Sequence, residues 1–287
     1  MMRAVLVGTL LICSAAAMGA PIGLQTALPV ARDEYLVRAQ FVDLERSAVS
    51  GPAEMNAQAL IGAIGYGFSP RLAGFAALPW LSKELESSGL TRRAEGLGDL
   101  TLFGRYTLFQ NDSPGRTFRV APVLGVVAPT GKDDEVDALG RLPRPLQTGA
   151  GSWAGFGGAV LTWQTLDWQT DAQVQYRRHG SDEGFRPGDL WRLDGSLQYR
   201  VLPRRLDAAS GFTYAVVEAA WVRAGRETRG GARTDTGGTQ LMFAPGLQYV
   251  GRRSVWEAQW QFLVSDNLRA NAMQDDRLIR LSLRWAF

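Results

Sequence analysis

Cysteine and histidine are nearly missing from this sequence, and each shortage excludes a kind of site. The one cysteine is Cys13 and the one histidine is His179. Beyond Cys13 the chain can form no disulfide and offers no thiolate nucleophile or Cys-ligated metal site. Because a single imidazole with scattered carboxylates is a poor ligand set for zinc or copper, we expect no metal and no cofactor.

An excess of charge of one sign is also missing. The chain has 31 basic and 28 acidic residues and a formal net charge of +3. This balance argues against a nucleic-acid partner. All basic residues except Lys83 and Lys132 are arginines. Because a guanidinium keeps its charge and pairs readily with carboxylates, the composition favours a polar interior held by ion pairs.

Long hydrophobic runs occur only at the start. Arg3 precedes the apolar run from Ala4 to Ile12, and small residues follow up to Ala20. This pattern predicts a secretory signal peptide at residues 1–20. No later stretch has 18 consecutive apolar residues, so we expect no membrane-spanning helix. An exported membrane protein of this composition has to cross the bilayer as strands, which predicts a location in the outer membrane of a Gram-negative cell.

Alternation with a period of two dominates the rest of the chain. From Asp167 to Arg178 every second side chain is Asp, Gln or Arg, and nearly all of those between are apolar or aromatic. Similar alternation recurs at Trp191–Val201, Val255–Val264 and Ile279–Phe287. Such segments are typical of strands with one face in water and the other in an apolar medium.

Twelve segments of this kind predict an all-β fold, a twelve-stranded antiparallel transmembrane barrel of the outer-membrane type over residues 35–287. The even number and the alternation of short turns with long polar loops are typical of bacterial barrels. We expect residues 21–34 to form a periplasmic N-terminal segment, and whether they plug the barrel is open. The alternative is a secreted β-sandwich. The predicted strands are 35–43, 57–68, 72–81, 97–110, 117–130, 152–163, 167–178, 191–201, 212–223, 239–250, 255–264 and 279–287, with longer loops near 44–56, 82–96, 131–151, 179–189, 224–238 and 265–276.

Two features predict partners in the outer membrane. The last strand ends in Trp285-Ala286-Phe287, which resembles the terminal signal read by the outer-membrane assembly machinery. Aromatic residues at the strand ends predict two interfacial girdles against outer-membrane lipid. Loop arginines are candidates for contact with lipopolysaccharide phosphates, namely Arg141, Arg144, Arg226, Arg229 and Arg233.

The polar faces of the strands predict the residues that line the lumen. Mixed charges there can form a polar pore for small solutes, or they can simply brace the barrel by pairing. Nothing in the predicted lumen is conspicuously aromatic. The charged lumen-lining candidates are Arg38, Asp99, Arg105, Arg119, Asp171, Arg177, Arg192, Asp194, Arg200, Glu218, Glu257, Arg280 and Arg284.

Two loop motifs have a chemical alternative. His179-Gly180-Ser181-Asp182 resembles the His-x-Ser-Asn of outer-membrane phospholipases, but Asp182 replaces the expected Asn. A serine hydroxyl needs a positioned base to attack, so we expect no enzyme activity. The acidic group Asp133, Asp134, Glu135 and Asp137 fits either a divalent ion or a solvated loop, and the solvated loop is favoured.

Several short motifs resemble one known family. They are Gly96-Leu97-Gly98-Asp99-Leu100, Pro129-Thr130-Gly131-Lys132 and Pro245-Gly246-Leu247-Gln248-Tyr249, together with Pro122 and Glu218. With them the chain, from about residue 35 to its end, is similar to the outer-membrane transporter family labelled "putative meta-pathway of phenol degradation". It departs from that family where Thr148-Gly149-Ala150-Gly151 stands in place of a glycine-serine stretch. The resemblance implies a transporter-type barrel with no catalytic residues.

The predicted function is therefore an outer-membrane channel or transporter for passive uptake of small solutes, among them small aromatic or other organic compounds. One alternative is a phospholipase-like barrel hydrolase that uses His179 and Ser181. The other is a structural or surface-binding barrel, which would bind ligands through its loops without solute flux.

Overall fold

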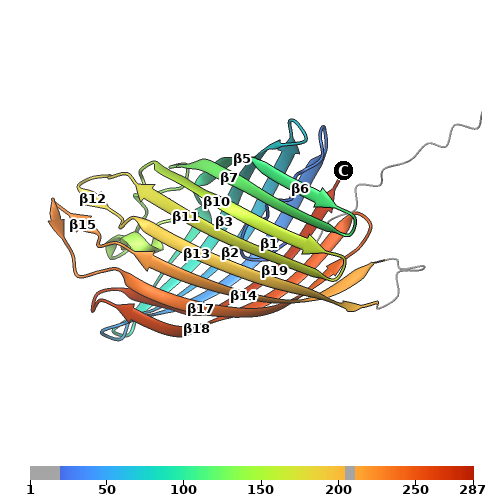
Figure 1. The fold of residues 1–287 in the computed structure, drawn as a ribbon. Coiled ribbons are helices and arrows are strands. Elements are labelled where there is room, and N and C mark those ends of the chain that lie inside the picture. Colours follow the sequence, from blue (N-terminus) through green and yellow to red (C-terminus); the bar gives the residue numbers. More distant parts are fainter. Residues whose placement is uncertain (1–19, 204–210) are drawn as a thin grey trace, which may run out of the picture.

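The fold is a single closed antiparallel β-barrel, shown in Figure 1. The structure, a computed structural model, describes residues 20–203 and 211–287. The predicted signal peptide lies, except for Ala20, outside the described residues. No helix among the described residues has both the length and the apolar character that crossing a membrane requires.

Fourteen strand segments form the barrel sheet. Two small sheets and one short 3₁₀ helix, η1 (Arg144–Leu146), belong to the loops. The barrel segments are β1 (Tyr35–Ala48), β2 (Glu54–Gly67), β3 (Leu72–Ser87), β4 (Leu90–Leu97), β5 (Leu100–Tyr106), β6 (Phe109–Ser113), β7 (Arg116–Ala128), β10 (Ala154–Thr165), β11 (Trp168–His179), β13 (Leu190–Leu202), β14 (Phe212–Ala224), β17 (Gly238–Val250), β18 (Ser254–Leu268) and β19 (Met273–Ala286).

These segments make twelve strands, because β4, β5 and β6 are successive pieces of one strand that is interrupted at residues 98–99 and 107–108. The ring closes where β19 pairs with β1, and Tyr35 and Phe287 exchange both backbone hydrogen bonds, at 3.3 and 3.0 Å. Pairing of β7 with β10 completes the circuit. The predicted twelve-stranded antiparallel barrel is confirmed.

Three predicted long loops are wrong, because the strands continue through them. β1 and β2 are joined by residues 49–53, β3 and β4 by Ser88 and Gly89, and β18 and β19 by residues 269–272. The polar composition of these stretches suggested loops, but backbone pairing persists there, supported by cross-strand contacts. Arg93 Nε, for example, lies 2.6 Å from an oxygen of Glu84, its partner in the register. The longer loops at 129–153, 180–189 and 225–237 are as predicted.

The outer wall of the barrel is apolar, with aromatic side chains near both ends of the strands. At the short-turn end Trp168 and Tyr199 lie side by side, with ring centroids 4.3 Å apart. At the long-loop end Tyr176 and Trp191 are neighbours at 4.8 Å. Trp168, Tyr199 and Trp191 are all exposed on this outer wall. The two aromatic levels match the interfacial girdles of outer-membrane barrels.

Depth in the membrane should decide the cost of a charge on this outer wall. Ala172 is exposed on β11, midway along the strand between Trp168 and Tyr176. We expect Ala172→Arg to lower the free energy of unfolding in a bilayer by about 2 to 4 kcal/mol, because the charge lies near the midplane. Gln58→Arg, exposed near the loop end of β2, is the control and should cost at most about 1 kcal/mol. Equal costs in urea titrations of bilayer-inserted protein would contradict this register.

Candidate functional site

The lumen is occupied by the chain's own N-terminal segment. Residues 21–34 are predicted to form a periplasmic N-terminal segment, and the sequence does not decide whether they plug the barrel. In the structure, residues 20–30 lie inside the barrel. Ile22, Ala27 and Leu28 are almost fully buried there. Of the two arrangements that the sequence leaves open, the structure has the plug, because the barrel wall offers partners for the backbone and apolar side chains of this segment.

Barrel side chains accept hydrogen bonds from the backbone N–H groups of this segment. The carboxylate of Glu218 on β14 accepts from Ile22 N at 2.7 Å and from Gly23 N at 2.9 Å. Thr162 Oγ1 on β10 accepts from Ala27 N at 2.7 Å. Buried backbone groups need such partners, since an unpaired one is costly. The plug, as we call residues 20–32, is therefore bound specifically by the wall.

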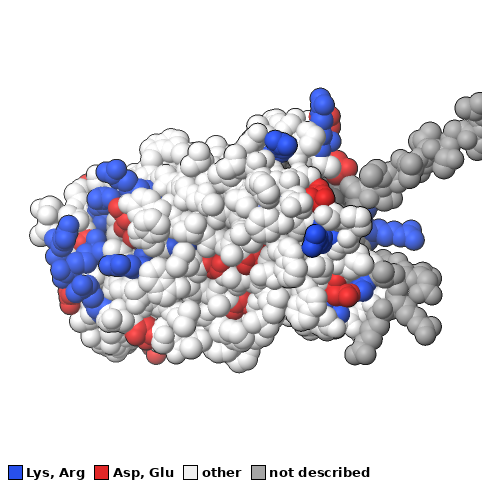
Figure 2. Space-filling model, in the orientation of Figure 1, with Lys and Arg blue, Asp and Glu red and all other residues white. Residues whose placement is uncertain are grey.

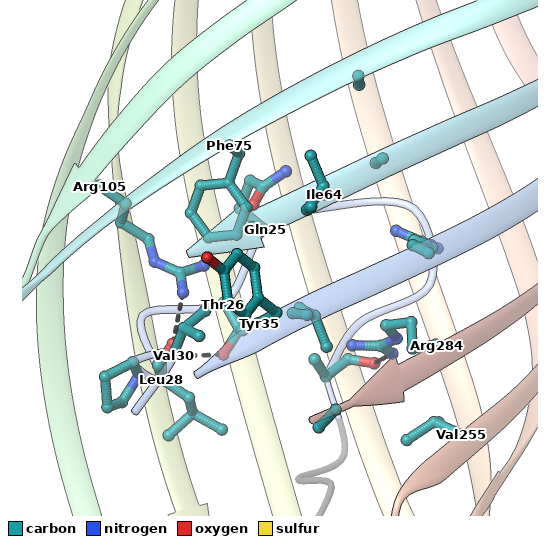
Figure 3. Close-up of a pocket in the computed structure, with 18 of the residues that line it drawn as sticks. Gln25, Thr26, Leu28, Val30, Tyr35, Ile64, Phe75, Arg105, Val255 and Arg284 are labelled. Carbon is teal, nitrogen blue, oxygen red and sulfur yellow. Dashed lines mark hydrogen bonds between the residues drawn. The ribbon is translucent and has the colours of Figure 1, made fainter. Parts of the chain in front are cut away.

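Three arginines donate to carbonyl oxygens of the plug. Arg284 Nη2 lies 2.6 Å from the carbonyl oxygen of Ala20. Arg38 Nη2 lies 2.7 Å from that of Ile22, and Arg105 Nη2 lies 2.6 Å from that of Leu28 (Figure 3). Two of these contacts hold the start of the plug, and the third holds it near its other end. These three contacts use only main-chain atoms of the plug.

One half of the wall, β11 to β19, is polar and internally bonded. The buried carboxylate of Glu257 is paired with Arg284 and, at 3.2 Å, with Arg38, and it accepts from Gln248 Nε2 at 2.7 Å. Asp171, fully buried, accepts from Gln169 Nε2 at 2.8 Å and from the Thr162 hydroxyl. Buried charges are tolerated when they are paired and hydrogen-bonded in this way.

The other half of the wall, β1 to β10, is mostly apolar and holds a row of aromatic side chains. Phe75 on β3 stacks on Phe103 on β5, with ring centroids 4.7 Å apart, and Phe156 on β10 lies 6.2 Å from Phe103. Arg105 lies over the Phe75 ring at 5.0 Å and Arg177 over Phe156 at 5.4 Å. The expectation that the lumen lacks a conspicuous aromatic group is therefore wrong.

A cavity of about 570 Å³ lies between the plug and the apolar half of the wall. Its lining includes Ile61, Ala63 and Phe75 from the wall, with Leu28 and Val30 from the plug (Figure 3). The charged residues that line it are Arg38, Arg105, Arg284 and Glu34. A space of this size, mostly apolar with a few polar groups, is typical of a small-molecule site.

The predicted lumen residues fall into three groups. Asp99 lies in the break between β4 and β5, where it accepts from Gly131 N at 3.0 Å and Ala150 N at 2.9 Å, so it anchors a loop. Two others form pairs close to the short turns, Arg119 with Asp112 and Arg200 with Asp167. The remaining ten form the plug contacts, the lumen-side pairs or the cavity walls, namely Arg38, Arg105, Asp171, Arg177, Arg192, Asp194, Glu218, Glu257, Arg280 and Arg284.

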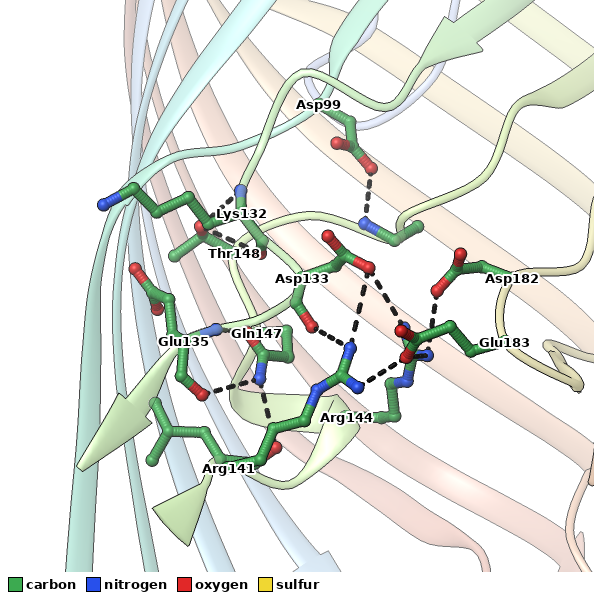
Figure 4. A network of polar contacts seen from close by, with 12 residues as sticks. Asp99, Lys132, Asp133, Glu135, Arg141, Arg144, Gln147, Thr148, Asp182 and Glu183 are labelled. Atoms are coloured by element: carbon green, nitrogen blue, oxygen red, sulfur yellow. Dashed lines mark hydrogen bonds and ion pairs between the residues drawn. The ribbon is translucent and has the colours of Figure 1, made fainter. Parts of the chain in front are cut away.

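An ion-pair network at the long-loop end ties two loops together (Figure 4). Arg144 lies 2.9 Å from a carboxylate oxygen of Asp182 and 3.6 Å from one of Asp133. Arg141 contacts Glu183 at 2.5 Å. The loop between β7 and β10 is thereby fastened to the loop after β11. It folds over the barrel end rather than extending freely.

Two members of the acidic group in this loop, Asp133 and Asp137, form ion pairs with arginines. Asp137 is paired with Arg92 at 2.7 Å, and the hydrogen bond from that guanidinium lowers the pKa of the Asp137 carboxyl. Among residues 20–203 and 211–287 no group of three or more His, Cys, Asp or Glu is arranged to hold a metal ion.

His179 lies at the end of β11. Its ring Nδ1 is 2.9 Å from the carbonyl oxygen of Gly188, and its backbone N–H donates to Asp189 at 3.1 Å. Within the described residues no hydrogen bond joins the imidazole to Ser181. The geometry therefore gives His179 a role in fixing the loop and shows no activated nucleophile.

The closed barrel and its apolar outer wall with two aromatic levels define an outer-membrane type of β-barrel. The chain belongs to the family described as "Putative MetA-pathway of phenol degradation", whose model matches residues 49–272. The family resemblance inferred from the short motifs is thereby confirmed. No curated protein sequence matches the chain.

Two solved structures show the same kind of fold. An outer membrane channel from Pseudomonas putida F1 is similar with a TM-score of 0.72 at 15% identity, over 94% of this chain and 100% of that one. The beta domain of the Bordetella autotransporter BrkA gives a TM-score of 0.53 at 12% identity, over 89% of this chain and 100% of that one. At such identities the likeness is one of fold.

Proposed function

We propose that this chain is an outer-membrane channel for passive uptake of small organic solutes, and that the plug closes its lumen at rest. One observation carries the proposal: residues 20–30 lie in the lumen beside an apolar cavity of about 570 Å³. A barrel that only braced a membrane would need no cavity between plug and wall. A channel, in contrast, needs both a solute site and a means of staying closed.

The lumen has an apolar half and a polar half, and this division favours a solute with an apolar ring and a polar group. Phe75 and Phe103 offer flat apolar faces next to the cavity, and Arg105 adds a donor beside them. Such solutes bury their rings against aromatic side chains and keep a hydrogen bond for the polar group. The family description, which refers to phenol degradation, agrees with this class of solute.

Filling the cavity should reduce uptake selectively. Ala63, which faces the cavity, is replaced by Phe, and the neighbouring Gly62→Phe is the matched control because a Cβ there meets no atom within 4 Å. In vesicles reconstituted with either variant, uptake of phenol-sized aromatic solutes is measured against the unchanged protein. We expect Ala63→Phe to slow uptake about tenfold or more, since the ring occupies solute volume.

The control should transport at the rate of the unchanged protein, because its new ring points into lipid. Unchanged uptake by Ala63→Phe would show that solutes do not use this cavity. A protein that carries no solute in any form, the plug-deleted one included, would refute the channel function itself.

A further inference from the structure

Two arginines lie on the outer wall at the long-loop end, one at the aromatic level and one directly beyond it. Arg178 on β11 and Arg223 on β14 are exposed and share the outward face with Tyr176 and Trp191. In the register Trp191 pairs with Tyr176 on one side and with Arg223 on the other. Arg178 follows Tyr176 by two residues and so lies about 7 Å farther along the strand. This is the level at which lipid headgroups begin.

A small sheet beyond the barrel rim carries two more arginines. It consists of β12 (Phe185–Arg186), β15 (Thr228–Arg229) and β16 (Ala232–Arg233). The exposed Arg229 pairs in register with Phe185, and its guanidinium lies 5.4 Å from the centre of that ring. Arg233 is exposed on the outer edge strand β16. The hydrogen-bonded sheet therefore holds these side chains above the sector of the wall that bears Arg178 and Arg223.

Two acids of this sector, Asp189 and Asp235, are already paired, whereas Glu227 has no basic group within 4.0 Å among the described residues. Asp189 accepts from Arg186 at 2.8 Å and from the Tyr176 hydroxyl at 2.9 Å, and Asp235 contacts Arg226 at 3.2 Å. Within the described part of the chain no carboxylate lies within 4.0 Å of the guanidinium of the other four arginines. Figure 2 shows basic side chains gathered at this end of the molecule. We call these four the arginine surface: Arg178, Arg223, Arg229 and Arg233.

We propose that the arginine surface binds the phosphate groups of a lipid A headgroup in the outer leaflet. Guanidinium groups bind phosphate through paired hydrogen bonds, and the four arginines have no ion-pair partner among the described residues that would compete with a phosphate. The aromatic wall directly below, with Tyr176 and Trp191, offers an apolar surface for acyl chains. A ligand with phosphates above and acyl chains below matches both parts, whereas a free phosphate would use only the upper one. The inference assumes the proposed outer-membrane location with the long loops outward.

Lipid binding by the purified full barrel in detergent tests the proposal. Binding of lipid A that carries both phosphates is measured by native mass spectrometry for the unchanged protein and for Arg178→Gln/Arg223→Gln. The matched control is Arg252→Gln/Arg253→Gln, two exposed arginines at the short-turn end. We expect the first variant to bind at least tenfold more weakly and the control to bind like the unchanged protein. Dephosphorylated lipid A should bind all three proteins equally weakly.

Three results would overturn the proposal. They are equal binding by all variants, equal binding of phosphorylated and dephosphorylated lipid, and competition by inorganic phosphate alone at concentrations matching the lipid. Solute uptake serves as a separate readout, because the arginine surface lies outside the lumen. Loss of lipid binding with unchanged uptake supports the arginine surface, and failure of uptake in every variant would count against the channel function and not against this site.

Discussion

Deleting residues 21–32, directly after the predicted signal peptide, should raise the ion conductance of the reconstituted barrel by roughly tenfold or more, because the deletion removes the segment that fills the pore. The plug occupies the space between Glu218 on one wall and Arg105 on the other, bonded to both. Without it, the polar half of the wall faces an open, water-filled path. Single-channel recording in planar bilayers measures the change.

A deletion of two residues in an exposed loop provides the control. Gly230 and Gly231 lie at the tip between β15 and β16, with open space around both. Removing them should leave the conductance at the low level of the intact chain. Equal conductance of the intact and plug-deleted proteins would mean that the segment does not close the lumen.

Glu257→Ala should have the largest effect on stability of any single change in the lumen. Its side chain is completely buried and is the shared partner of Arg38 and Arg284. Alanine leaves two guanidinium groups in the lumen without their carboxylate, which costs about 3 to 5 kcal/mol when a buried pair is broken. Both arginines also hold plug carbonyls, so the plug should loosen with the wall.

The matched comparison is Glu84→Ala, which breaks an exposed cross-strand pair with Arg93. Solvent-exposed pairs contribute at most about 1 kcal/mol, so this variant should unfold almost like the unchanged protein. Urea-induced unfolding in lipid vesicles gives both values. Similar losses for the two variants would show that the Glu257 cluster is as solvated as the surface pair.

The alternation of side chains predicted the barrel because lipid and water impose opposite demands on neighbouring residues of each strand. The same logic predicted the inward position of residues such as Asp171 and Glu257. It misplaced the ends of β3 and β4, since outside the lipid the outward face becomes polar while pairing continues. The period and polarity of the sequence indicate the medium that each face of a strand contacts. Where a strand ends is determined by the pairing of its backbone.

The plug and the aromatic row were missed for other physical reasons. Residues 20–32 have neither helical nor strand periodicity, and their partners are wall side chains such as Glu218, nearly 200 positions distant. Phe75, Phe103 and Phe156 occupy inward positions, yet aromatic residues in a barrel sequence suggest lipid contact. Glycines make the room: a Cβ on Gly125 would lie 2.3 Å from Phe156 and 2.6 Å from Phe103 Cβ. The signal for the aromatic row in the sequence was phenylalanine at inward positions, with glycine at the facing positions of neighbouring strands.

Thiol labelling at Ala27 tests most directly whether the chain fills its own barrel. Ala27 is a plug residue that is fully buried against the wall, and the only native cysteine lies in the predicted signal peptide. In outer-membrane vesicles, Ala27→Cys should react with a membrane-impermeant maleimide far more slowly than Ser50→Cys in an exposed loop. Equal labelling rates of the two cysteines would contradict the account.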